Sequence, residues 1–108
     1  MRVCELQEHG FVPLAMPDGD RQVEGAYVGD LLSWVMGRAQ ADNAWITIMS
    51  NVNVIAVASL ADTSCVILAE GVDMPEEVLQ TARDKDVNVL GSDLPIFETA
   101  VRLAGLIA

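Results

Sequence analysis

The chain is organised around three short apolar runs, each followed by small polar residues: WITIM at 45–49 before Ser50-Asn51, CVILA at 65–69 before Glu70-Gly71, and VNVLG at 87–91 before Ser92-Asp93. A helical pattern follows each polar pair. Strands that alternate with helices of this length pair in parallel, because the helix carries the chain back across the sheet. The sequence therefore predicts an α/β fold: a small, mostly parallel sheet of about five strands flanked by helices.

The segment after the first run, residues 53–61, contains two competing patterns. Its β-branched residues favour a strand. A strand that continued from Trp45 to Leu60 would, however, far exceed the usual length of about 5–6 residues. Asn51 can cap a helix, and Val54 and Ala58 recur with helical spacing. We therefore predict a helix over 53–61.

The N-terminal part of the chain predicts a short helix over 2–8 that stops at Gly10, followed by strands over 11–15 and 22–27. Pro13 suits a strand at the edge of a sheet, because proline has no backbone N–H to donate. The two strands are compatible with a hairpin or with an excursion at the edge of the sheet.

Three aspartates precede apolar helical patterns and predict N-caps. Asp30 precedes the helix predicted over 31–39, Asp73 precedes a helix with Pro75 in its first turn, and Asp93 precedes the helix predicted over 95–107.

The composition predicts one domain, residues 1–108, that associates with itself. Hydrophobic residues make up 52% of the chain and its mean hydropathy is +0.35. One small core cannot hide so much apolar surface, so we expect a homodimer that shares the helices over 31–39 and 95–107.

The net charge and the lengths of the apolar segments indicate which partners and which cellular compartment to expect. The formal net charge of −10 repels phosphate backbones and anionic lipid heads, so we expect neither nucleic acid nor membrane as partner. No apolar run approaches the roughly 20 residues that span a bilayer, and residues 1–6 lack the apolar core of a signal peptide. We expect a cytoplasmic protein.

The sequence predicts no metal site, no cofactor and no catalytic residue. Cys4 and Cys65 stand far apart without a neighbouring histidine, and His9 is the only histidine. Phosphate-binding, dinucleotide-binding and nucleophile-elbow motifs are all absent from the chain.

One candidate binding site remains, at the carboxyl ends of the predicted strands. Ligands of open parallel sheets bind where strand-end loops and helix N-termini gather. The ligand-binding residues predicted there are Gly29, Asp30, Ser50, Asn51, Glu70, Gly71, Ser92 and Asp93. The alternative is that these residues only cap helices and form turns.

The chain resembles the DRTGG domain family along nearly its whole length. The similarity is carried by GAYVGDLLSWVM at 25–36, WITI at 45–48, the apolar helix over 54–60, VILAEG at 66–71, PEE at 75–77 and DLPIFETA at 93–100. Of the motif that names the family, Asp-Arg would fall near Asn51-Val52 and Thr-Gly-Gly near Ala69-Glu70-Gly71, where only Gly71 matches.

The resemblance implies a fold like the N-terminal domain of HPr serine kinase. It also implies an accessory, regulatory role, as in family members inserted in regulatory inorganic pyrophosphatases and some phosphate acetyltransferases. We therefore expect a non-catalytic homodimeric module that binds a small, nucleotide-like molecule or a partner protein. The alternatives are an accessory subunit of a phosphotransfer or hydrogenase-related enzyme system, and a purely structural interaction domain.

Overall fold

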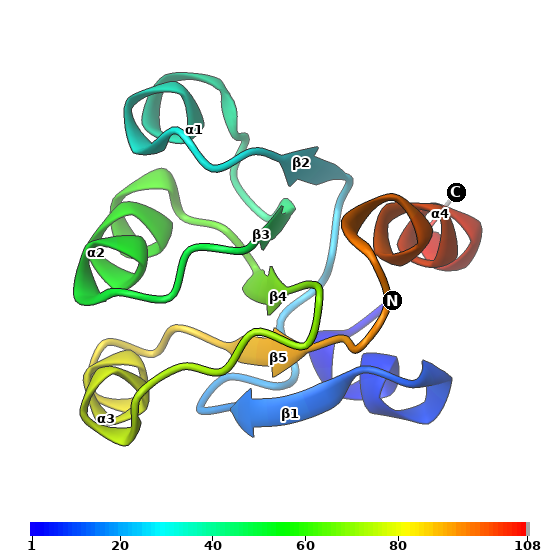
Figure 1. Ribbon diagram of the computed structural model, residues 1–108, viewed down its shortest axis with the longest axis horizontal. Coiled ribbons are helices and arrows are strands. Elements are labelled where there is room, and N and C mark those ends of the chain that lie inside the picture. The colour runs from blue at the N-terminus through cyan, green and yellow to red at the C-terminus, as the bar shows by residue number, and fades with distance from the viewer. Residues whose placement is uncertain (108) are drawn as a thin grey trace.

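A five-stranded sheet forms the middle layer of the protein in a computed structural model that describes residues 1–107 (Figure 1). The strands are β1 (Val12–Ala15), β2 (Ala26–Val28), β3 (Ala44–Thr47), β4 (Cys65–Leu68) and β5 (Val89–Gly91), in the spatial order β1-β5-β4-β3-β2. Strands β2 to β5 are parallel, and β1 runs antiparallel beside β5. The predicted α/β class, with a mostly parallel sheet of about five strands, is confirmed.

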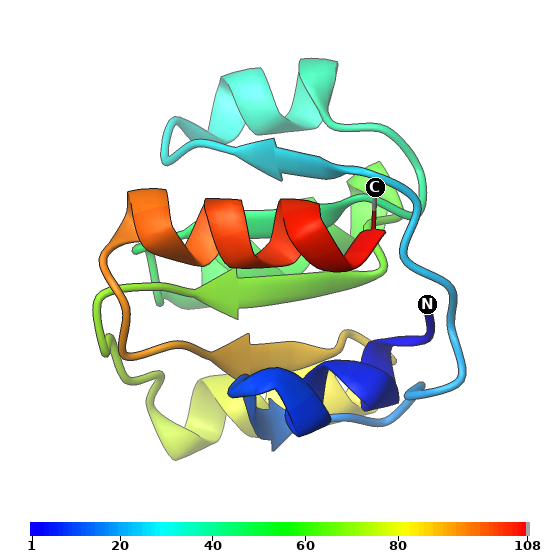
Figure 2. The same ribbon diagram turned by 90° about the vertical axis from the view of Figure 1, so that its right-hand side faces the viewer.

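Helices cover both faces of this sheet. They are η1 (Val3–His9, a 3-10 helix), α1 (Leu32–Arg38), α2 (Val52–Ala61), α3 (Glu76–Asp84) and α4 (Ile96–Ile107). Helices α1, α2 and α3 lie on one face, and α4 and η1 lie on the other (Figures 1 and 2). No helix within residues 1–107 is both long enough and apolar enough to cross a bilayer.

The two helical layers explain why β3 and β4 are apolar at every position except Thr47. Every residue of both strands is buried, as expected for parallel strands covered on both faces. Successive side chains alternate between the faces. Trp45 and Val66 pack beneath α1–α3, whereas Ile46 and Ile67 pack beneath α4 and η1.

The helix predicted over 53–61 is confirmed as α2. The Asn51 side chain accepts a hydrogen bond from the backbone N–H of Asn53 at 2.9 Å and so caps the helix. Val54 and Ala58 are buried on the sheet side, so tertiary packing outweighs the strand propensity of the β-branched residues.

The strand predicted over 22–27 is wrong for most of its length, because β2 begins only at Ala26. Residues 16–25 instead cross from β1 to the opposite edge of the sheet, along the amino ends of the parallel strands (Figure 2). Val23 and Glu24 donate their backbone N–H groups to carbonyls of other loops rather than to a strand. Since β1 and β2 lie at opposite edges, they form no hairpin.

The predicted caps at Asp30 and Asp73 are also wrong. Helices α1 and α3 begin after Leu31 and Pro75 without any side-chain cap. The first backbone N–H of α4 is bound by Glu70, which belongs to the preceding loop of the sheet, and not by the nearby Asp93.

Candidate functional site

The predicted site residues all lie at one edge of the sheet. Strands β2 to β5 are parallel, so the loops that follow them leave at the same edge (Figure 2). We call these loops, residues 29–31, 48–51, 69–75 and 92–95, the carboxyl rim. It contains every member of the predicted set: Gly29, Asp30, Ser50, Asn51, Glu70, Gly71, Ser92 and Asp93.

The loops that follow two neighbouring strands of this rim lead to helices on opposite faces of the sheet. After β4 the chain enters α3 on one face, whereas after the adjacent β5 it enters α4 on the other face (Figure 1). Loops that diverge in this way open a crevice, and ligands of open α/β sheets bind in such crevices. A hollow of about 110 Å³ lies at this point. Its lining is Val12, Leu14, Gly71, Val72, Asp73, Gly91, Ser92 and Asp93.

Hydrogen bonds tie the two loops of the crevice together. Glu70 has a left-handed backbone, with φ of 63°, and its Oε2 accepts the N–H of Ile96 at 2.7 Å. The backbone N–H of Gly71 donates to the carbonyl of Ser92 at 2.9 Å. A helix N-terminus readily binds an anion, and here the Glu70 carboxylate occupies it. The hollow therefore lies beside a helix N-terminus whose partial positive charge is already neutralised by Glu70.

The side chains of Ser92 and Asp93 have different surroundings. The buried Ser92 hydroxyl lies 2.9 Å from the hydroxyl of Thr99 and accepts the N–H of Leu94 at 3.2 Å. Within residues 1–107 the exposed Asp93 carboxylate has no hydrogen bond or ion pair. Asp73 also lines the hollow and is likewise exposed and unpaired within residues 1–107, so both carboxylates are available to a ligand there.

In the other half of the rim, Asp30 links the loop after β2 to the loop after β3 through hydrogen bonds. Its Oδ1 accepts the hydroxyl of Thr47 at 2.7 Å and the backbone N–H of Ile48 at 3.0 Å. The carbonyl of Gly29 accepts the indole N–H of Trp45 at 2.8 Å. These contacts, like the Asn51 cap, stabilise the loops themselves. Exposed apolar side chains, Leu31, Ile48 and Val52, accompany them.

The rim is acidic. Its loops contain Asp30, Glu70, Asp73 and Asp93 but neither lysine nor arginine. Such a set can accept hydrogen bonds from hydroxyl and amino groups, whereas it offers no side-chain cation to a phosphate. No cluster of three or more His, Cys, Asp or Glu side chains within residues 1–107 is placed to hold a metal ion.

The opposite edge of the sheet, which we call the amino edge, has a larger hollow of about 220 Å³ that no sequence motif indicates. It lies where α2 and α3 end, and Asp18, Arg21, Asp62 and Lys85 are among the residues that line it. The acids come from separate loops, so only the fold brings them together.

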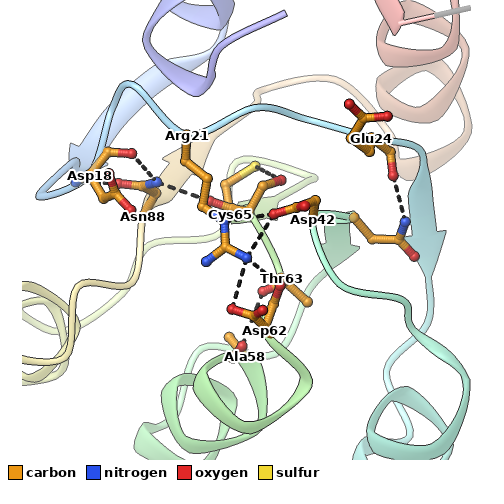
Figure 3. Close-up of polar contacts among 11 residues, drawn as sticks. Asp18, Arg21, Glu24, Asp42, Ala58, Asp62, Thr63, Cys65 and Asn88 are labelled. Atoms are coloured by element: carbon orange, nitrogen blue, oxygen red, sulfur yellow. Dashed lines mark hydrogen bonds and ion pairs between the residues drawn. The ribbon is translucent and has the colours of Figure 1, made fainter.

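Arg21, in the crossing segment 16–25, is the centre of the polar network there (Figure 3). Its Nε and Nη2 donate to Asp42 Oδ1 at 3.0 and 2.8 Å. Nη2 also donates to the carbonyl of Asp62 at 2.7 Å and to Asp62 Oδ1 at 2.8 Å. Burial lowers the pKa of Arg21, but the hydrogen bonds to Asp42 and Asp62 outweigh burial and leave the pKa raised. Arg21 therefore fastens the crossing segment to the loop between α1 and β3 and to the end of α2.

The buried Cys65 is not a nucleophile. Burial raises the pKa of its thiol from 9.0 to about 12, although a hydrogen bond from Ser64 acts in the opposite direction. At neutral pH the thiol stays protonated, and only the thiolate is reactive.

Comparison with known proteins agrees with this fold. The family model described as the DRTGG domain matches residues 18–106. No curated protein matches the chain. A crystal structure of the CBS and DRTGG domains of the regulatory region of Clostridium perfringens pyrophosphatase, complexed with the activator diadenosine tetraphosphate, is similar with a TM-score of 0.69 and 15% sequence identity.

That similarity covers 93% of this chain but 44% of the pyrophosphatase chain, so the protein spans less than half of its structural neighbour. The family match covers most of this chain, because it runs from the crossing segment to the last turns of α4. The chain belongs to the DRTGG domain family.

Proposed function

We propose that this chain, as a single domain over residues 1–108, is a non-catalytic regulatory module that acts as a homodimer and binds a small molecule at the carboxyl rim. The observation that supports it most is the crevice between β4 and β5, where Gly71, Ser92 and Asp93 help to line a hollow and the Asp93 carboxylate has no partner among residues 1–107. Family membership supports a regulatory role rather than a chemical one.

The chemistry of the crevice narrows the ligand class. Asp93 and the neighbouring Asp73 accept hydrogen bonds, so the ligand presents hydroxyl or amino groups to them. The hollow of about 110 Å³ is smaller than the roughly 300–1,000 Å³ of a typical ligand pocket, so only part of the ligand enters it. A ribose or a base edge fits this description, with any phosphates directed into solvent.

The neighbouring pyrophosphatase structure holds diadenosine tetraphosphate, so adenosine compounds are the first candidates to test. The Glu70 carboxylate at the start of α4 argues against a phosphate bound within the crevice, because two anions would compete for one helix end. We therefore expect adenosine to bind about as well as its phosphorylated derivatives.

The apolar side chains of the other half of the rim favour a second occupant, a partner protein. Leu31, Ile48 and Val52 are between 43% and 56% exposed. Leu31 and Ile48 lie in the loops that follow the neighbouring strands β2 and β3, and Val52 is the first residue of α2. A protein surface that covers them would bury apolar area without requiring any cation. In that case the module serves as an accessory subunit of a larger enzyme system.

A thermal-shift series tests the proposal. Ligand at 100 times its dissociation constant stabilises the folded protein by about 2.7 kcal/mol, which a melting curve detects readily. We expect adenosine or an adenosine phosphate to raise the melting temperature, and Asp93→Asn to remove most of that rise. Asp86→Asn, the same change of charge at the amino edge, is the matched control and should leave the rise intact.

No rise with any adenosine compound would remove the small-molecule proposal and leave the partner-protein alternative. A rise that survives in Asp93→Asn would move the ligand away from the crevice.

A further inference from the structure

Helix α4 has a second apolar face that the fold does not use. One side of the helix packs on the sheet through Thr99 and Leu103. The opposite side, which we call the outer face of α4, consists of the exposed residues Phe97, Glu98, Val101, Arg102, Ala104 and Gly105. Phe97 is 72% exposed and Val101 is 55% exposed, and both line an open hollow of about 380 Å³. Large apolar side chains so exposed on one helix face mark a docking surface.

We infer that a second copy of this chain covers the outer face of α4, with the two α4 helices antiparallel across a two-fold axis near Ala100 and Val101. The inference rests on the homodimer of the proposed function and names the surface that forms it. In such an isologous contact each residue i of one copy meets residue j of the other, and j meets i. The outer face satisfies this condition for both charge and size.

The charges are complementary under this symmetry. Glu98 and Arg102 lie one turn apart on the same side of the helix, about 6 Å along its axis. A two-fold axis midway between the levels of Ala100 and Val101 brings each Glu98 to within one residue, about 1.5 Å along the helix, of the level of the partner's Arg102, so two opposite-charge contacts form. Arg102 Nη1 donates to the carbonyl of His9 at 3.3 Å, which leaves the other N–H groups of the guanidinium for the partner.

The sizes are complementary under the same symmetry. On the other side of the outer face of α4, Phe97 comes level with the small residues Ala104 and Gly105 of the second copy. A Cβ atom added at Gly105 would have no heavy atom within 4 Å, so the space above this glycine is open. The Phe97 ring of each copy therefore has room to lie over the other helix, while Val101 meets Val101 at the centre.

The exposed tryptophan on α1 is a weaker candidate for the same role. The guanidinium of Arg38 already stacks on the ring of Trp34, 3.8 Å from its centroid. One face of the indole is thus covered within the protomer, and the stack contributes favourably without a partner. The face of α4 has no such cover.

Sedimentation of the full chain over micromolar to millimolar concentration tests the inference. A contact of one helix per copy is below the standard interface of roughly 800 Å² per partner, so we expect a dissociation constant on the order of 10–100 µM. Val101→Asp should weaken the dimer at least about 30-fold, because it buries a carboxylate at the centre. Leu60→Asp, which replaces an apolar residue that is 75% exposed on α2, should leave the dimer intact.

Charge reversal tests the antiparallel register itself. Glu98→Arg places like charges side by side in the homodimer, as does Arg102→Glu, and each should weaken association at least about tenfold. A mixture of the two single variants pairs opposite charges again and should associate like the unaltered chain. A melting curve of each variant checks that it still folds.

A dimer that resists Val101→Asp, or a mixture that fails to associate, would overturn the α4 interface while the homodimer of the proposed function stands. A chain that stays monomeric throughout would overturn both the interface and the homodimer, and the thermal-shift series at the rim would still decide ligand binding separately.

Discussion

Arg21 offers the sharpest test of how the crossing segment is held to the rest of the fold. In Arg21→Met the side chain keeps most of its length but loses all four hydrogen bonds to Asp42 and Asp62. The two aspartates, in the loop after α1 and at the end of α2, then face each other without a cation. We expect this change to lower the free energy of unfolding more than any other single arginine substitution.

The magnitude follows from the exposure of the partners. The side chains of Asp42 and Asp62 are 43% and 67% exposed, so each ion pair contributes only about 0.5–1 kcal/mol. The hydrogen bond to the Asp62 carbonyl, at the negative end of α2, adds about 0.5–1 kcal/mol. The sum is about 1.5–3 kcal/mol, or roughly 6–20 °C in the melting temperature of a domain of this size.

Urea unfolding followed by circular dichroism measures the loss. Arg83→Met is the matched control. Arg83 forms an ion pair with Glu76, which is 75% exposed, and a hydrogen bond with the exposed Gln80, so its loss should cost no more than about 0.5 kcal/mol. Arg21→Lys keeps the charge but not the planar fork and should fall between the two. A loss in Arg21→Met that does not exceed the loss in Arg83→Met would refute the reasoning.

Three further predictions concern the rim and the core. Glu70→Ala removes the cap of α4 and should destabilise the protein by about 1 kcal/mol. Glu70→Gly loses the same cap but should be less destabilising by about 0.5–1 kcal/mol, because glycine adopts the φ of 63° at this position without strain; urea titrations compare the two variants. Asp30→Ala should cost about 1–3 kcal/mol, since it leaves the buried Thr47 hydroxyl without its carboxylate partner, and a loss below 0.5 kcal/mol by the same titrations would contradict this. Because burial raises the pKa of Cys65 to about 12, only the unfolded chain loses this proton between pH 9 and pH 12, and the free energy of unfolding falls over that range. Cys65→Ala should reduce the slope of this fall by about 1.4 kcal/mol per pH unit, and an unchanged slope would refute the burial effect.

The layered fold could be predicted because its signals are local and repeated. Apolar runs of strand length alternate with helical patterns, and this alternation alone indicates a parallel sheet. The helix α2 could be recognised against its β-branched composition because a strand of that length would be exceptional and Asn51 offers a cap.

The parts that could not be predicted depend on contacts between distant residues. Residues 22–25 alternate like a strand, yet their backbone partners lie at the N-terminus and in the loop after α1. Asp93 has the spacing of a cap for α4, but Glu70 reaches the helix from the loop after β4. Arg21 finds its aspartates 21 and 41 residues further along the chain, and no spacing rule connects them.

The candidate site could be predicted from the sequence only in part. Parallel pairing places the predicted rim residues at one edge, so their gathering follows from the sheet. Which of them line a hollow depends on the placement of α3 and α4 on opposite faces of the sheet. This placement brings Gly71, Ser92 and Asp93 together, whereas Asp30 and Asn51 stabilise loops in the other half of the rim.

A titration of the isotopically labelled protein with adenosine and diadenosine tetraphosphate, followed by amide NMR spectra, tests the central claim most directly. The rim proposal predicts saturable shifts of the amide signals of Gly71, Ser92 and Asp93, with the amides around Arg21 at the amino edge unmoved. Shifts confined to the amino edge, or no saturable shift at the crevice with either compound, would contradict it.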